Sequence, residues 1–333
     1  MTVPATRVGP HVLFNEEEDD PLRRRELLAA LAAATTGTVL GSPAAARAAE
    51  PTPSAVAAAV RASRADFSAC RYDALSRALS ARIALAESLG SQGRPEQAAT
   101  AVAKLYSIAT RLCIKLGEDG LAPVTADRAL SAALGGADAV TVAEAHRMVS
   151  STWRRRGRYD RAVDIAVAAA QELGGGRNVD VAERLSVQGD LYATAAYTAA
   201  KQGDRDTAQG LIAEAAAIAG RLDHGGPSQV VLHQVSVSYL LGDAGEAIEH
   251  ARRVDPAGLP SAERRARYWI DVARAFSQWG KPDRCYRALL AAERAAPEEV
   301  RRGSVRVMAG GLMRHDRTLP GVRAFAHRVG ALG

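Results

Sequence analysis

Basic and aromatic side chains recur at set distances before a repeated glycine in this chain. They lie three, six, ten or thirteen residues before it, and their chemistry suits the binding of an anion. A guanidinium group binds a carboxylate or phosphate through two parallel hydrogen bonds, and a tyrosine adds an apolar ring with a polar tip. The candidate binding residues are Lys104, Arg111, Arg147, Arg154, Tyr197, Tyr239, Arg267 and Arg274.

Residues that could catalyse a reaction follow no recognised pattern. The sequence has no G-x4-G-K-[ST] phosphate loop, no G-x-S-x-G nucleophile elbow and no H-E-x-x-H zinc motif. The seven histidines never pair at metal-ligand spacing. The widely separated Cys70, Cys113 and Cys285 indicate small buried side chains in a reducing compartment. We therefore predict no enzyme activity, no catalytic or metal-binding residue and no cofactor.

The net charge of +6 is unevenly distributed, because residues 1–53 are net acidic and the remainder is correspondingly more basic. A mildly basic body suggests anionic partners. Its many acidic residues argue against a nucleic-acid-binding domain by itself.

The candidate residues must be positioned by the elements around the repeated glycine. Five glycines, 38 to 46 residues apart, are each followed five positions later by a small residue. Amphipathic stretches flank each glycine, so each is expected to turn a helical hairpin. The pairs are Gly117/Ala122, Gly157/Ala162, Gly203/Ala208, Gly242/Ala247 and Gly280/Cys285.

The hairpins resemble the tetratricopeptide repeat. Its pattern W-x2-L-G-x2-Y followed by A-x3-F corresponds here to Trp269, Val272 and Phe276 and then to Cys285 and Leu289. We predict an all-α fold, an α-solenoid of about six to seven tetratricopeptide-like hairpins over residues 54–333.

Two features extend the predicted array beyond the five regular units. Gly93 with Ala98 indicates a degenerate hairpin at the start. Two further helices are expected over residues 298–314 and 319–331. Ser54 is the expected N-cap of the first helix.

The tetratricopeptide resemblance implies that the first helix of each hairpin lines a concave groove, which places the eight candidate residues there. Cations occupy both ends of the array, and Tyr197 and Tyr239 lie in the middle. We therefore predict a groove with an apolar centre that binds a peptide or an anionic small molecule. The alternative is a solvated basic face.

Residues 1–53 are expected to form a disordered or linker segment with a short apolar helix over residues 22–40. An acidic run covers residues 16–20, and the apolar residues 27–40 would span only ~21 Å as a helix, short of a ~30 Å hydrocarbon core. No stable membrane span is predicted. Arg24-Arg25 with Ala46-Arg47-Ala48 also resembles a twin-arginine export signal, so an exported scaffold at the cell envelope is the alternative to a cytoplasmic protein.

The chain as a whole resembles the part of actinobacterial Cro/repressor-type (XRE) regulators that follows their helix-turn-helix domain. Residues 14–28 resemble the linker and residues 319–323 the end of the array. The resemblance implies a ligand-sensing or protein-interaction module linked to transcriptional regulation, compatible with a homodimer. No helix-turn-helix precedes residue 14, so direct DNA binding is doubtful. Either the chain is a stand-alone sensor, or its start codon was placed too late.

Overall fold

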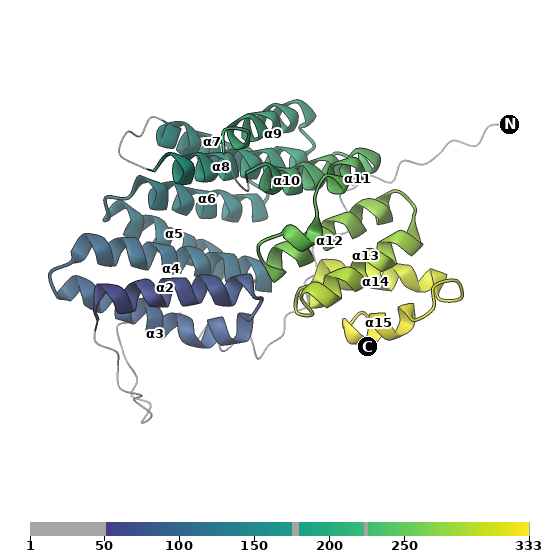
Figure 1. The fold of residues 1–333 in the computed structure, drawn as a ribbon, viewed down its shortest axis with the longest axis horizontal. Coiled ribbons are helices and arrows are strands. Elements are labelled where there is room, and N and C mark those ends of the chain that lie inside the picture. Colours follow the sequence, from purple (N-terminus) through teal and green to yellow (C-terminus); the bar gives the residue numbers. More distant parts are fainter. Residues whose placement is uncertain (1–50, 175–179, 223–225, 333) are drawn as a thin grey trace, which may run out of the picture.

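A computed structural model describes residues 51–174, 180–222 and 226–332, and within these ranges every regular element is a helix (Figure 1). The apolar helix expected over residues 22–40 and the export signal lie outside the described residues. The α-helices are α2 (Pro53–Ser68), α3 (Tyr72–Ser91), α4 (Pro95–Leu116), α5 (Leu121–Leu134), α6 (Ala139–Arg155), α7 (Tyr159–Gly174), α8 (Val181–Gln202), α9 (Arg205–Ala219), α10 (Gly226–Leu240), α11 (Ala244–Arg252), α12 (Ala262–Gln278), α13 (Pro282–Ala295), α14 (Gly303–Leu312) and α15 (Val322–Arg328). Three short 3-10 helices are η1 (Pro256–Gly258), η2 (Glu299–Arg301) and η3 (Met313–His315).

Consecutive helices pack in adjacent pairs, which confirms the predicted α-solenoid. The pairs built around the five repeated glycines are α4 with α5, α6 with α7, α8 with α9, α10 with α11, and α12 with α13.

The repeated glycines turn the hairpins, as predicted, because all five adopt left-handed backbone with φ between 68° and 91°. An L-residue with a Cβ is strained there. Gly203 is the C-cap of α8, and Asp204 then caps α9 by accepting the backbone N–H of Thr207 at 3.2 Å. Each turn therefore ends one helix and begins the next within a few residues.

Small side chains on the second helices allow close packing within the hairpins. Ala162, Ala166 and Ala208 are fully buried. The aromatic residues of the same hairpins, Trp153 and Tyr192, are only half-buried, and an arginine covers the ring of Trp153. The Arg161 guanidinium lies 4.0 Å from the centre of the Trp153 ring. This cation–π contact covers the part of the aromatic ring that the small alanine side chains do not reach.

The additional hairpin at the start of the array differs from the prediction in its register. Gly93 does form a turn, with φ of 83°, but this turn joins α3 to α4, and α4 is already the first helix of the Gly117 hairpin. The additional hairpin is instead α2 with α3. Its turn contains Cys70, which has a φ of 57°, rather than a glycine.

The ends of the array also differ slightly from the sequence-based boundaries. Thr52, not Ser54, caps α2, because Pro53 occupies the first helical position and Thr52 Oγ1 accepts the N–H of Ala55. The two C-terminal helices are present but shorter than expected. η2 precedes α14, and α15 begins only after Gly321.

The three cysteines are free and buried, as predicted. Burial raises the pKa of Cys70 to about 11 and that of Cys113 and Cys285 to about 12. They are therefore neutral thiols that pack as small apolar groups.

The array curls until its two ends meet. Helix α2 contacts α12, although nearly two hundred residues separate them in the sequence, and α14 also packs against α12 (Figure 1). The first helices of the hairpins consequently surround a common interior. Within the described residues, no helix has both the length and the apolar character needed to cross a bilayer.

Candidate functional site

The interior of the curled array is a cavity of about 920 Å³. All eight candidate residues predicted from the sequence line it. They come from the first helices of five hairpins: two each from α4, α6 and α12, and one each from α8 and α10. The structure thus brings together residues from both ends of the array, and whether they bind a ligand stays a prediction.

Positive charge dominates the cavity wall, where twelve Lys or Arg residues face four Asp or Glu residues. The cations are Arg64, Lys104, Arg111, Lys115, Arg147, Arg154, Arg155, Lys201, Arg264, Arg267, Arg274 and Arg302. The acids are Glu144, Asp190, Glu263 and Asp271.

A cation lies against one of the two tyrosines at the predicted apolar centre. The guanidinium of Arg154 lies 5.0 Å from the centre of the Tyr197 ring. Burial raises the pKa of Tyr197, but Arg154 and Arg274 outweigh it and hold that pKa below its ordinary value. Arg154 reaches Tyr197 from the adjacent hairpin, because α6 packs against α8, and the curvature of the array adds the influence of Arg274 from α12.

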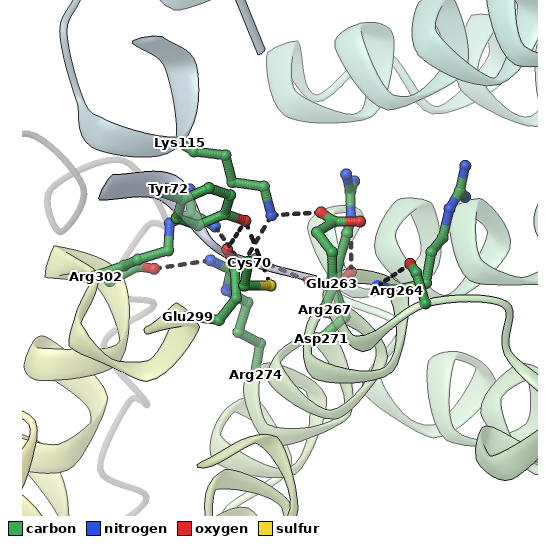
Figure 2. A network of polar contacts seen from close by, with 12 residues as sticks. Cys70, Tyr72, Lys115, Glu263, Arg264, Arg267, Asp271, Arg274, Glu299 and Arg302 are labelled. Atoms are coloured by element: carbon green, nitrogen blue, oxygen red, sulfur yellow. Dashed lines mark hydrogen bonds and ion pairs between the residues drawn. The ribbon is translucent and has the colours of Figure 1, made fainter. Parts of the chain in front are cut away.

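A buried ionic network, which we call the closure network, joins the two ends of the array (Figure 2). Its members are Tyr72, Lys115, Glu263 and Glu299. Lys115 Nζ on α4 lies 2.5 Å from Glu263 Oε1 on α12 and 2.8 Å from Glu299 Oε2 in η2. Tyr72 Oη donates a hydrogen bond of 2.5 Å to Glu299 Oε1.

The charges of the closure network stabilise one another. Burial disfavours the ionised form of Glu299, but Lys115 and Arg302 outweigh burial and hold its pKa below the ordinary value. The pKa of Glu263 is likewise lowered, because Lys115 and Arg267 overcome the cost of burial. Both carboxylates are therefore ionised at neutral pH, and Lys115 is fully engaged by them.

Asp271 organises the neighbouring part of the wall (Figure 2). Its Oδ1 accepts a 2.8 Å hydrogen bond from Arg274, and its Oδ2 accepts a 2.8 Å hydrogen bond from Ser236. Arg274 also donates to Ser304 Oγ at 2.9 Å. The guanidinium of Arg274 is therefore fixed in orientation toward the cavity.

Other arginines of the wall lack such compensation. Among the residues that the structure describes, no carboxylate forms an ion pair with Arg147 or Arg154. Burial, followed by repulsion from Arg147, lowers the pKa of Arg111 to about 10. Burial also lowers the pKa of Arg154 to about 10, and Arg267 adds repulsion. These groups remain protonated at neutral pH, so like charges crowd the cavity.

Sequence reasoning missed several cavity residues, and a helical-face signal was present for some of them. Arg264 lies one turn before Arg267, and Lys201 one turn after Tyr197, so both extend a face already identified. His233 is half-buried and lines the cavity, and the histidine spacing gave no signal for it. Arg302 lies outside the repeats, where their spacing gives no signal.

The fold and the cavity define this chain as a helical-repeat protein whose array curls around a basic interior. In the part of the chain that the structure describes, no group of three or more His, Cys, Asp or Glu residues could hold a metal ion. The side chains available in the cavity are suited to hold an anion.

Comparison with known proteins supports the fold. The chain is similar to the apo form of RapI, with 14% identity, a TM-score of 0.51, and coverage of 83% of this chain and 94% of RapI. It also matches BtubC (BKLC) from P. vanneervenii with 14% identity and a TM-score of 0.44, over 72% of this chain and 90% of BtubC. No protein-family model and no curated protein sequence matches the chain. At this identity the likeness to RapI concerns the fold alone.

Proposed function

We propose that this chain is a non-enzymatic ligand-sensing or protein-interaction module that binds an anionic peptide or small molecule in its central cavity. The observation that carries the proposal is the excess of cations on the cavity wall, together with arginines that no described carboxylate neutralises. Such a concentration of like charge is unfavourable in the free protein, and an anionic ligand would relieve it.

The proposal includes a link to transcriptional regulation. Its support is the resemblance of residues 14–28 and 319–323 to the linker and the array end of actinobacterial regulators. The closure network gives a physical route for signalling, because a ligand bound among α4, α6 and α12 contacts both ends of the array at once.

A co-purification experiment tests the proposal. The full chain is purified from its native host as wild type and as the variant Arg147→Ala with Arg274→Ala, and bound molecules are identified by mass spectrometry. We expect an anionic molecule or an acidic partner to accompany the wild type and to be lost from the variant.

The matched control is Arg252→Ala with Arg287→Ala, which removes the same charge from side chains that are 60% and 76% exposed. The control should retain whatever the wild type binds, and thermal melting should show that both variants fold. An identical set of bound molecules in all three proteins would contradict the proposal.

A further inference from the structure

Two arginines of the cavity wall form no ion pair with a described carboxylate, although four acids line the same wall. Glu263 is engaged by Lys115, and Asp271 by Arg274 and Ser236. Arg147 and Arg154 on α6 have no ion pair with any described carboxylate. The surplus positive charge is therefore concentrated at definite side chains.

Arginines from two helices converge in the cavity, and of these only Arg267 has an ion pair with a described carboxylate, that of Asp271 at 3.8 Å. Arg147 and Arg154 lie on α6, while Arg264 and Arg267 lie on α12, and all four act on His233 of α10. Burial lowers the pKa of His233 well below its ordinary value, and repulsion from these four guanidinium groups lowers it further. The imidazole is thus neutral, and four positive charges lie around it.

Buried polar atoms without partners mark the same place. Arg147 Nε, Arg274 Nε and His233 Nδ1 are each buried and, among the described residues, have no hydrogen-bond partner. A buried donor left unsatisfied costs roughly 1–3 kcal/mol. The two arginine Nε atoms are donors, and the Nδ1 atom of neutral His233 donates or accepts according to its tautomer, so a ligand with several acceptor oxygens would fit between α6, α10 and α12.

We propose that the cavity binds a compact small molecule carrying two or more phosphate groups, held between the arginines of α6 and those of α12. This inference rests on the proposed function and names the class of its ligand. Each phosphate presents three acceptor oxygens and about 1.5 to 2 negative charges, so two or more phosphates match several converging guanidinium groups. A single carboxylate would leave most of these cations unpaired.

The size of the cavity favours a small molecule over an extended peptide. Its volume of about 920 Å³ lies within the range of about 300–1,000 Å³ found for small-molecule sites. An acidic peptide spreads its charge over ~3.3 Å for every residue and also needs partners for its backbone groups. Phosphates joined in one compact molecule concentrate the same charge where the arginines meet.

Calorimetric titration of the full chain tests the inference with four probes: inorganic orthophosphate, inorganic tripolyphosphate, citrate and a hexaglutamate peptide. We expect tripolyphosphate to bind at least about tenfold more tightly than each of the others. Its affinity should fall when the salt concentration rises from about 0.15 M to about 0.5 M, because charge attraction is screened.

The variant Arg147→Gln with Arg154→Gln should weaken tripolyphosphate binding at least about tenfold. Neither side chain has an ion pair that the fold requires, and circular dichroism checks that the variant is folded. The control variant Arg252→Gln with Arg287→Gln lowers the net charge equally on exposed side chains and should bind as the wild type does.

Three results would overturn the inference. If tripolyphosphate binds no more tightly than orthophosphate, the cavity does not recognise joined phosphates. If tripolyphosphate binds equally to the two double variants, it is attracted by the overall positive charge of the protein and not by the cavity arginines. If hexaglutamate or citrate binds most tightly and depends on Arg147, the ligand class is wrong, while the proposed function as an anion-binding module stands.

Discussion

Glu299 is fully buried and yet ionised, and it shows how single residues set the shape of this protein. An unpaired buried carboxylate would be strongly unfavourable. Here Lys115 and Tyr72 both donate hydrogen bonds to it, and Glu263 shares the lysine. Removing one member of such a network lowers the free energy of unfolding by more than the intact network contributes to it. The reason is that the remaining charges stay buried without a partner.

The residue-scale prediction concerns the charge of Glu299. Glu299→Gln keeps the shape of the side chain but leaves Lys115 with one carboxylate partner, so we expect the free energy of unfolding to fall by roughly 2–4 kcal/mol. Urea denaturation measures it. Asp283→Asn is the control, because Asp283 pairs with Arg287 on the exposed surface and should change stability by no more than about 0.5 kcal/mol. Equal effects of the two substitutions would show that the closure network does not hold the ends together.

At the scale of elements, the glycine turns set the hairpin geometry. Gly203 separates α8 from α9 with a φ of 91°, and a Cβ added there would meet no atom within 4 Å. The constraint at this position is therefore the backbone conformation rather than space.

The same pair of helices provides a prediction and its control. Gly203→Ala should lower the free energy of unfolding by about 1–2 kcal/mol, because alanine is strained in left-handed backbone. Gly210→Ala should raise it by about 0.5–1 kcal/mol, because Gly210 is exposed within α9 and a Cβ there also meets open space. Thermal or urea denaturation measures both. Destabilisation by both substitutions would point to a loss of packing instead.

At the scale of the whole molecule, the closed array makes stability depend on acidity. The pKa of Glu299 lies below its ordinary value of 4.5, since Lys115 and Arg302 outweigh burial. A carboxyl group with a lowered pKa contributes stability above its unfolded-state pKa, and that contribution is lost as the pH falls through the folded-state value. Glu263 acts in the same direction.

We therefore expect the free energy of unfolding to decrease below about pH 4.5, where the two carboxyl groups of the closure network take up protons in the unfolded chain but stay ionised in the folded one. Small-angle X-ray scattering should show the radius of gyration increase only at a lower pH, where the carboxylates of the folded chain are themselves protonated and the ends of the array separate. In Glu299→Gln one of these carboxylates is already neutral, so its stability should decrease less between pH 7 and pH 3.5. A pH dependence identical to that of the wild type would contradict this assignment.

The five glycine-turned hairpins, their register and the face of each first helix follow from the sequence alone. These features depend on residues three or four positions apart and on glycines placed where the turn needs left-handed backbone. Both are local properties of the sequence. For this reason the repeat spacing assigns Arg147 and Arg274 to equivalent faces of their helices, and the resemblance to the tetratricopeptide repeat implies that this face lines the groove. The same local reasoning misplaced the first hairpin, because Cys70 takes a conformation usually given to glycine.

Closure of the array depends on tertiary contacts that the repeat spacing does not predict. The contact of Lys115 with Glu299 joins residues 184 positions apart, and that of Tyr72 with Glu299 joins residues 227 positions apart. Such contacts depend on small rotations between successive hairpins that accumulate along the array, and no periodicity in the sequence records their sum. Because of that accumulated rotation, cations from the two ends of the predicted groove line one cavity, and His233 lies between them.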